Sequence, residues 1–433
     1  MKPASYKHYL LFVLLLIYAF NTADRLVLGL MLQDIKADLD LSDTQLGLLT
    51  GIAFAFFYSI MGIPIARWAD RGDRISVISI TTLLWGAAMA LCGAAGNFLQ
   101  LLAIRVGVAV GEAGAVPPSN SLIPEYFSRA ERPKAVAIYH LGGPLGALVG
   151  YFAAGWINQF VGWRATFVIV GIPSLLLAAL VWFTLEEPRR NVPAVEPPRE
   201  QADSLWHVAI TLFANKTFRN LVICFSIVAF FGNGILQWQP AYFMRTYGLG
   251  SGELGTWFAL LYGGGGLIGL YAGGTLASRF AAHNERLQLL AAATAYCGFA
   301  ILQAGIYIAT SLYLAFLLLA LAMVGTGLVM GPLFGAVQTL VPARMRAMSI
   351  AVIYLCANLI GLGLGPLIAG VLSDMLRPAF GEESLRYALL ALCPGYLWAA
   401  FHMWKASRTV MTDLARANEG CSENSSSAHV QQI

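Results

Sequence analysis

The sequence predicts an all-α membrane protein in which twelve transmembrane helices form two pseudo-symmetric six-helix bundles. Three observations support this fold class. Of the 433 residues, 58% are hydrophobic and only 12% are charged, whereas a soluble domain has about 25% charged residues. The apolar residues fall into twelve runs, each long enough to cross about 30 Å of hydrocarbon as a helix. A polar segment separates six of these runs from the other six.

Each apolar run is expected to be one membrane-spanning helix. The first run is too long for the apolar part of a signal peptide, and no small-residue cleavage site follows it, so we expect it to be retained. The first six runs end before a charged, Pro-rich stretch, which continues into the amphipathic "SLWHVAITLF". The runs occupy residues 9–32, 45–66, 76–95, 98–123, 135–160 and 164–184, and then 219–245, 254–277, 287–309, 311–340, 347–374 and 384–404.

The two sets of six runs resemble each other. The segment "WADRGDR" follows the second run and "LASRFAAHNER" follows the eighth, while "FSRAERPKAVAIY" precedes the fifth and "VPARMRAMSIAVIY" the eleventh. Two parallel repeats with a polar site between them are typical of an alternating-access carrier. We therefore predict an N-terminal bundle (1–185), a cytoplasmic linker (186–217), a C-terminal bundle (218–406) and a cytoplasmic tail (407–433).

The basic residues predict the orientation. With both termini in the cytoplasm, 20 of the 27 Lys and Arg residues lie in inner segments, five lie in outer segments and two lie inside the membrane. The positive-inside rule therefore places both termini in the cytoplasm, and we expect a multi-pass protein of the cell inner membrane.

Several classes of function are disfavoured by the composition. The six cysteines and six histidines are scattered along the chain without paired spacing, which indicates neither a disulfide framework nor a metal site. The sequence contains no G-x-x-x-x-G-K-[ST] loop that could hold ATP. We expect no enzymatic activity, no cofactor and no nucleic-acid partner.

Two runs carry charges in their interior, Asp24 and Arg25 in the first and Arg105 and Glu112 in the fourth. At 1.5 Å per residue, all four lie within about 8 Å of the run midpoints. Such a charge costs roughly 3 kcal/mol and usually faces a partner inside the bundle. We therefore expect Asp24 to face Arg105. The alternative is a permanent pair that only fastens the two helices together.

The segment "ADRGDR", Ala69 to Arg74, resembles the G-x-x-x-D-R-x-G-R motif of the major facilitator superfamily, with Ala66 and Asp73 in place of glycines. A second copy ends at Arg279 and has Ser278 in place of the aspartate. The resemblance implies the two-bundle fold of that superfamily. It also implies a gate of charge pairs that closes the cytoplasmic side, with the following members: Asp70, Arg71, Arg74 and Arg279. For Asp70 and Arg71 the alternative is a solvated anchor of topology.

Within the superfamily, the chain resembles the spinster-like branch. The matching patterns are Asn21-x-x-Asp24-Arg25 and Arg105-x-x-x-x-x-Gly111-Glu112-Ala113, with Ala109 where that branch has glycine. This resemblance implies transport of lysophospholipids or sphingosine-phosphate-type lipids, coupled to protons. The anion:cation symporter branch, which takes up sugar acids and aromatic acids, shares N-x-x-D-R and a G-E-A-x-x-x-P pattern that ends here at Pro117. The two branches share these motifs, so the motifs do not distinguish a lipid substrate from an organic acid.

The charged residues have separate expected roles. Arg25 and Arg105 offer planar donors suited to a phosphate or carboxylate group, and Asp24 and Glu112 are the candidates for protonation. The second half offers uncharged candidates for substrate contact, for which helix packing is the alternative. These are Asn233, Gln237, Trp238, Tyr242, Gln338, Tyr354 and Asn358.

The expected function is proton-coupled transport of an amphipathic anionic solute by a monomer embedded in membrane lipid. A symporter of small organic acids is the alternative. A substrate-sensing receptor or an uncoupled lipid facilitator on the same fold is a third hypothesis.

Overall fold

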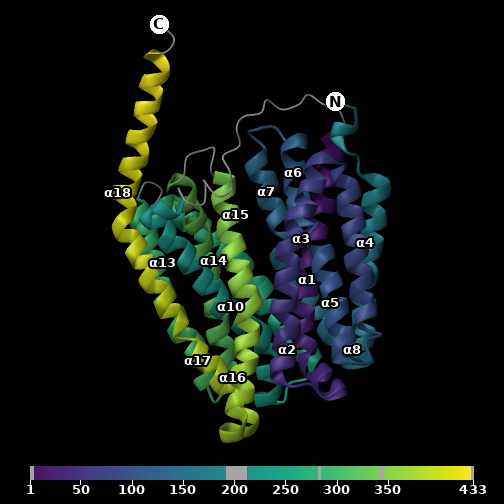
Figure 1. The fold of residues 1–433 in the computed structure, drawn as a ribbon. Helices are drawn as coiled ribbons and strands as arrows, with labels where there is room; N and C mark the ends of the chain where they lie inside the picture. Colours follow the sequence, from purple (N-terminus) through teal and green to yellow (C-terminus); the bar gives the residue numbers. More distant parts are fainter. Residues whose placement is uncertain (1–3, 192–211, 281–283, 341–345, 431–433) are drawn as a thin grey trace. The chain divides into compact units, whose positions relative to one another are not determined.

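A computed structural model of the chain describes residues 4–191, 212–280, 284–340 and 346–430. Within these ranges every regular element is a helix (Figure 1). The first half contains α1 (Ala4–Leu39), α2 (Asp43–Thr50), α3 (Ile52–Arg71), α4 (Arg74–Cys92), α5 (Phe98–Glu112), α6 (Val116–Tyr126), α7 (Arg132–His140), α8 (Gly142–Thr184) and the 3-10 helix η1 (Pro188–Asn191).

The second half contains two π-helical segments, η2 and η4, and one 3-10 helix, η5. Its elements are α10 (Lys216–Tyr247), α11 (Ser251–Phe258), η2 (Ala259–Gly264), α12 (Gly265–Phe280), α13 (Glu285–Ile308), α14 (Leu312–Leu340), α15 (Arg346–Cys356), η4 (Ala357–Leu364), α16 (Gly365–Phe380), η5 (Gly381–Glu383), α17 (Ser384–Leu392) and α18 (Gly395–Val430).

The chain is a multi-pass membrane protein. Nine helical segments among the described residues are long and apolar enough to cross a membrane. Two of them, Lys134–Arg190 and Val352–Ala415, each hold two of the expected spans. The expected span 254–277 is not one of the nine. The segments are therefore consistent with the twelve spans expected from the sequence.

The described contacts divide the chain into two compact units. Unit 1 consists of Met1–Pro197, Asn233–Gly264 and Leu362–Leu389. Unit 2 consists of Pro198–Gly232, Gly265–Gly361 and Leu390–Ile433. Among the described residues, the chain passes between the units within α10, after η2, within η4 and within α17. Unit 1 therefore contains the first half of the chain together with two segments of the second half.

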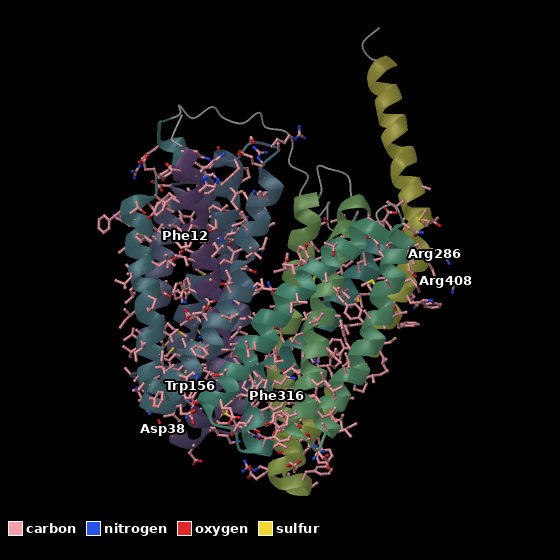
Figure 2. All side chains as sticks on the ribbon, turned by 180° about the vertical axis from the view of Figure 1, so that it is seen from behind. Phe12, Asp38, Trp156, Arg286, Phe316 and Arg408 are labelled. Carbon is pink, nitrogen blue, oxygen red and sulfur yellow. The ribbon has the colours of Figure 1, made fainter. Side chains whose placement is uncertain are left out.

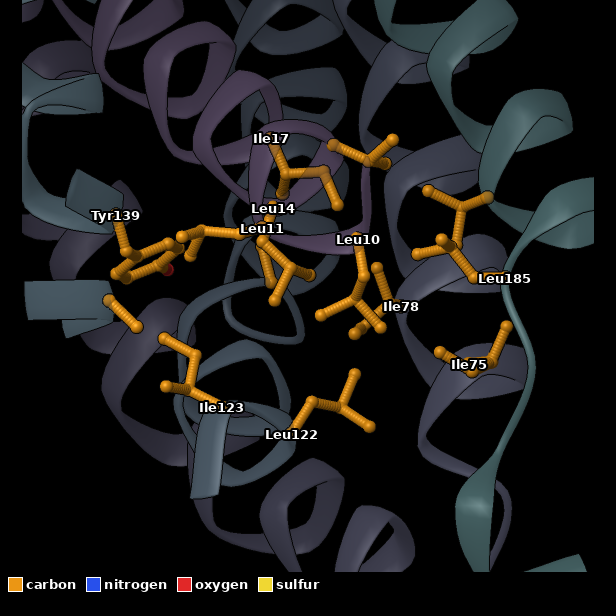
Figure 3. Packing of buried hydrophobic residues seen from close by; sticks show 14 of the residues in the cluster. Leu10, Leu11, Leu14, Ile17, Ile75, Ile78, Leu122, Ile123, Tyr139 and Leu185 are labelled. Atoms are coloured by element: carbon orange, nitrogen blue, oxygen red, sulfur yellow. The ribbon is translucent and has the colours of Figure 1, made fainter. Parts of the chain in front are cut away.

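The core of unit 1 near the start of α1 is made mostly of aliphatic side chains from five helices, with the ring of Tyr139 among them (Figure 3). Leu10, Leu14 and Ile17 of α1 are buried against Ile78 of α4 and Ile123 of α6. Burial of these side chains contributes roughly 25 cal/mol per Å² of apolar surface that would otherwise contact water. This packing fixes the rotation of α1 about its axis, and therefore the face on which Asp24 lies.

Glycines let α1 and α8 approach closely next to Asp24. A Cβ at Gly146 would lie 2.1 Å from the carbonyl oxygen of Ala19, and a Cβ at Gly150 would lie 2.7 Å from the Cβ of Ala23. Only glycine fits such distances, and small residues at membrane helix contacts allow this packing. The long helix α8 contains Gly162 at φ +77°, where its two expected spans meet.

The two ends of unit 1 carry different polar groups. At the end where α1 begins, here called the Lys7 end, Lys7 Nζ donates to Glu131 Oε1 at 2.5 Å. Hydrogen bonds from Lys7 and Ser128 lower the pKa of Glu131 to about 2. The opposite end is here called the Lys36 end, and Asp38 lies there (Figure 2). Phe12 points outward from the helices nearer the Lys7 end.

Unit 2 is held together by close helix contacts and by a buried aspartate. A Cβ at Gly269 of α12 would lie 2.3 Å from the carbonyl oxygen of Val324 in α14. Asp413 of α18 accepts hydrogen bonds from the backbone N–H and the hydroxyl of Thr217, at 2.9 and 2.6 Å. This contact satisfies a backbone donor at the start of α10.

Candidate functional site

The four intramembrane charges lie close together inside unit 1. Asp24 and Arg25 belong to α1, and Arg105 and Glu112 belong to α5. Asp24 and Glu112 are 0% exposed and Arg105 is 2% exposed. Arg25 Nε donates to Glu112 Oε2 at 2.6 Å, and Asn21 Nδ2 donates to the same oxygen at 3.3 Å. The charges predicted in one layer of the first and fourth spans therefore meet.

Asp24 interacts electrostatically with Arg105, but among the described residues the two form no ion pair. Asp24 Oδ2 instead accepts a hydrogen bond from Trp85 Nε1 at 2.6 Å. Among the ion pairs of the described residues, Arg25 is paired with Glu112, and Asp24 and Arg105 form none. A neutral indole from α4 therefore occupies one oxygen of this carboxylate, and its other oxygen is buried without a partner.

Aromatic rings of α3 support both arginines. The guanidinium carbon of Arg105 lies 5.3 Å from the ring centroid of Phe54, and that of Arg25 lies 5.3 Å from the same centroid. Arg25 also lies 4.6 Å from the ring of Tyr58, which stacks on Phe54 at 5.7 Å. The negative face of an aromatic ring attracts a cation, by about 2 kcal/mol when both are desolvated.

Several polar atoms of this cluster are buried and have no hydrogen-bond partner. They include both donors and acceptors: Arg25 Nη2, Arg105 Nε, Arg105 Nη1, Asp24 Oδ1 and Glu112 Oε1. A buried polar group without a partner costs roughly 1–3 kcal/mol and more when it is charged, so such groups are rare. The free donors suit an anion, and the free carboxylate oxygens suit a proton.

Two of the uncharged candidates form hydrogen bonds to the backbone of other helices. Gln237 Nε2 donates to the carbonyl oxygen of Arg25 at 3.5 Å, which places Gln237 beside the charged cluster. Trp238 is fully buried, and its indole N–H donates to the carbonyl oxygen of Pro366 at 2.8 Å. These contacts favour a packing role for Trp238.

The remaining uncharged candidates are spread over both units. Asn233 is half-buried and Tyr242 is buried, and both belong to unit 1. Tyr354, 48% exposed, and the half-buried Asn358 belong to unit 2. The side chain of Gln338 lies outside the part that the structure describes. Their contact with a substrate stays a prediction.

Sequence reasoning missed a polar network at the Lys36 end. Asp43 accepts two hydrogen bonds from the guanidinium of Arg245, both at 2.7 Å, one from Ser373 at 2.6 Å and one from Lys36. Asp374 accepts from the backbone N–H and the hydroxyl of Thr44, at 2.7 and 2.6 Å. The only local signal was the capping box at the start of α2, which predicts a helix start but not these long-range partners.

The residues of the "ADRGDR" segment have different surroundings. Arg74 is 1% exposed and its Nη2 pairs with Glu187 Oε1 at 2.5 Å. Its Nη1 also donates to the carbonyl oxygen of Ser121 at 3.0 Å and to Glu125 at 3.3 Å. Arg74 therefore fastens α4 to α6 and to the segment after α8.

The other gate candidates are not engaged in the same way. Asp70 and Arg71 are exposed, and neither side chain forms an ion pair with the residues described. The carbonyl oxygen of Asp70 accepts a hydrogen bond from Arg189 at 3.2 Å. The side chain of Arg279 lies outside the described part of the chain. The gating role of these residues stays a prediction.

We expect Arg74→Gln to destabilise the protein by about 3–5 kcal/mol, because it leaves the buried Glu187 carboxylate without its charged partner. Unfolding in detergent, followed by denaturant titration, measures the change. Arg71→Gln is the matched control, since Arg71 is exposed, and it should change the stability by less than about 0.5 kcal/mol. Equal stability of the two variants would contradict the structural role of Arg74.

Comparison with known proteins identifies the family. The sequence profile of the Major Facilitator Superfamily matches residues 14–366. The chain belongs to this superfamily. It is therefore a membrane transporter and not an enzyme.

Relatives of this chain carry names that refer to different transport activities. It is 33% identical over 406 residues to an MFS-type efflux pump of Mycolicibacterium smegmatis, covering 93% of both chains. It is 26% identical over 396 residues to a probable L-galactonate transporter of Escherichia coli, covering 87% of this chain and 84% of the relative.

A solved structure agrees with the fold. The crystal structure of a bacterial homologue of the human lysosomal transporter Spinster, inward-facing and unoccupied, has a TM-score of 0.83 and 31% identity. The match covers 95% of this chain and 99% of that one. The resemblance to the spinster-like branch and the superfamily fold are thereby confirmed.

Proposed function

We propose that the protein is a proton-coupled secondary carrier of an anionic solute. Arg25 and Arg105 bind the anionic group of the solute. Asp24 and Glu112 take up and release the coupled proton. One observation carries this proposal: Arg25 and Arg105 have buried nitrogens without partners, close to two buried carboxylates that each have an unpartnered oxygen.

Glu112 acts in this proposal as an internal substitute for the substrate. It now holds Arg25 through Nε at 2.6 Å. An arriving carboxylate or phosphate competes for the guanidinium, whose planar fork matches either group. The displaced Glu112 would be a buried carboxylate without its cation, which is unfavourable, so it takes a proton. Binding of anion and of proton therefore favour each other, as linkage requires.

The preferred solute is an amphipathic anion such as a lysophospholipid or a sphingosine-phosphate-like lipid. The likeness to a Spinster homologue over 95% of this chain supports this choice. The relative named as a probable L-galactonate transporter supports the second candidate, a small organic acid. In both cases the Lys7 end faces the cytoplasm, as the positive-inside rule predicts.

The network at the Lys36 end suits the closed side of an alternating-access cycle. Asp43 joins α2 to Arg245 of α10 and to Ser373 of α16. We infer that these hydrogen bonds break when the carrier opens at that end, and that the charged cluster is then reached from outside the cell.

The test is a ligand panel on the purified protein in detergent. We expect oleoyl lysophosphatidate to raise the unfolding temperature and L-galactonate to raise it less, because a ligand that binds the folded state stabilises it by mass action. Arg105→Ala should remove the shift. A larger shift with L-galactonate would favour the organic-acid symporter, and an unchanged shift in Arg105→Ala would contradict the proposed site.

A further inference from the structure

Two aromatic residues contact charged groups that could otherwise pair. Asp24 Oδ1 and Arg105 Nε and Nη1 are all buried without partners, and each could satisfy the other. Opposite charges attract strongly where the dielectric constant is low. The pair does not form, because Trp85 donates to Asp24 at 2.6 Å and Arg105 lies over the ring of Phe54 at 5.3 Å.

The backbone of α5 fixes the position of Trp85. This indole is 0% exposed. A Cβ at Gly111 would lie 2.6 Å from both the Cβ and the backbone nitrogen of Trp85, so α4 and α5 are in direct contact there. The indole N–H is thereby aimed at Asp24 on α1. A hydrogen bond to an ionised group is worth roughly twice a neutral one, so it competes with an arginine for the carboxylate.

Phe54 has the corresponding role for the arginines. Its ring is 2% exposed and serves Arg25 and Arg105 at the same distance, 5.3 Å. The ring of Phe54 is the aromatic surface against which the Arg105 guanidinium lies. The arginine is held in place while its Nε and Nη1 remain without acceptors.

We infer that Trp85 and Phe54 are positioning residues that keep Asp24 and Arg105 apart. The arginine then stays available to the substrate anion, and the carboxylate stays available to a proton. An internal Asp24–Arg105 pair would compete with the substrate for the guanidinium. The inference rests on the proposed function, because it assigns these two residues to the anion site described there.

The first experiment is Trp85→Phe, which removes the indole N–H and keeps an aromatic ring. We expect a structure of this variant to show Asp24 within hydrogen-bonding distance of Arg105. We expect its affinity for oleoyl lysophosphatidate, measured by calorimetric titration, to fall by about tenfold, because one charge-assisted hydrogen bond must now be broken. Trp163→Phe is the matched control, since its indole donates to Asp38 at the Lys36 end, and its affinity should not change.

The double variant Asp24→Asn/Trp85→Phe separates positioning from packing. An asparagine cannot form an ion pair with Arg105, so the double variant should bind the lysophosphatidate as tightly as Asp24→Asn alone. If Trp85→Phe weakens binding about tenfold in the Asp24→Asn background as well, Trp85 acts through packing and the inference is overturned. Phe54→Leu should also weaken binding of the lysophosphatidate. Phe54→Tyr keeps the aromatic ring and should bind as the unmodified protein does.

Failure of the proposed function would look different. If the unmodified protein binds neither lysophosphatidate nor L-galactonate, the anion site is wrong, and the structure of Trp85→Phe still decides the positioning role. An unchanged separation of Asp24 and Arg105 in that structure would overturn it.

Discussion

Glu112→Gln is expected to keep the exchange of substrate across the membrane and to lose the acceleration by a proton gradient. Glutamine has nearly the same shape and can still accept the hydrogen bond that Asn21 donates at 3.3 Å. It cannot gain or lose a proton, and it no longer holds Arg25 as an ion pair. The anion can therefore still bind and cross, but its passage is no longer linked to protonation.

The measurement uses proteoliposomes from one preparation. Counterflow reports exchange, and uptake driven by an imposed pH difference reports coupling. Glu131→Gln is the control, because Lys7 and Ser128 lower the pKa of Glu131 to about 2 and that carboxylate stays ionised throughout the assay. It should behave as the unmodified protein in both assays.

Each other outcome for Glu112→Gln has a distinct meaning. Loss of both activities would mean that Glu112 is required for binding or folding. Retention of both would assign the proton to Asp24, whose Oδ1 is buried without a partner, and would contradict the role proposed for Glu112.

Arg105→Lys is expected to be nearly as harmful as Arg105→Ala, with each weakening anion binding by roughly 100-fold. The guanidinium offers two nitrogens without a present partner, and an ammonium cannot reproduce a two-point contact with a carboxylate or phosphate. Lysine also loses the planar contact with the ring of Phe54, 5.3 Å away. Calorimetric titration with the ligand that stabilises the unmodified protein measures the effect.

Arg164→Lys is the matched control for this substitution. Arg164 lies at the Lys36 end with its side chain 42% exposed and pairs there with Asp38, and the variant should bind normally. Anion binding by Arg105→Lys within about threefold of the unmodified protein would show that a point charge suffices there.

The sequence predicts much of the fold because a membrane helix must be apolar over a fixed length. It also predicts that the four charges lie in one layer, since residue count along a helix gives depth. It does not predict the partners within the layer. Whether Asp24 contacts Arg105 or Trp85 depends on the rotation and separation of three helices, which are set by contacts such as Gly146 against Ala19.

The sequence does not predict the polar networks of Arg74 and Asp43 for a related reason. Arg74 pairs with Glu187, 113 positions along the chain, and Asp43 pairs with Arg245, 202 positions away. Single-sequence patterns report local period and not distant contacts. The π-helix η2 was also not predicted, because the glycines around Tyr262 indicate close packing but not a change in the number of residues per turn.

The charge balance of the cluster has an electrical consequence. With both carboxylates ionised, two arginines and two carboxylates carry no net charge. If one proton accompanies each monovalent anion, the loaded protein is as neutral there as the empty one, and the membrane voltage does no work on either crossing. A divalent phosphate monoester carried with one proton would add one negative charge, on which 100 mV acts with about 2.3 kcal/mol. In a cell with a negative interior, that voltage favours export of the dianion and opposes its uptake.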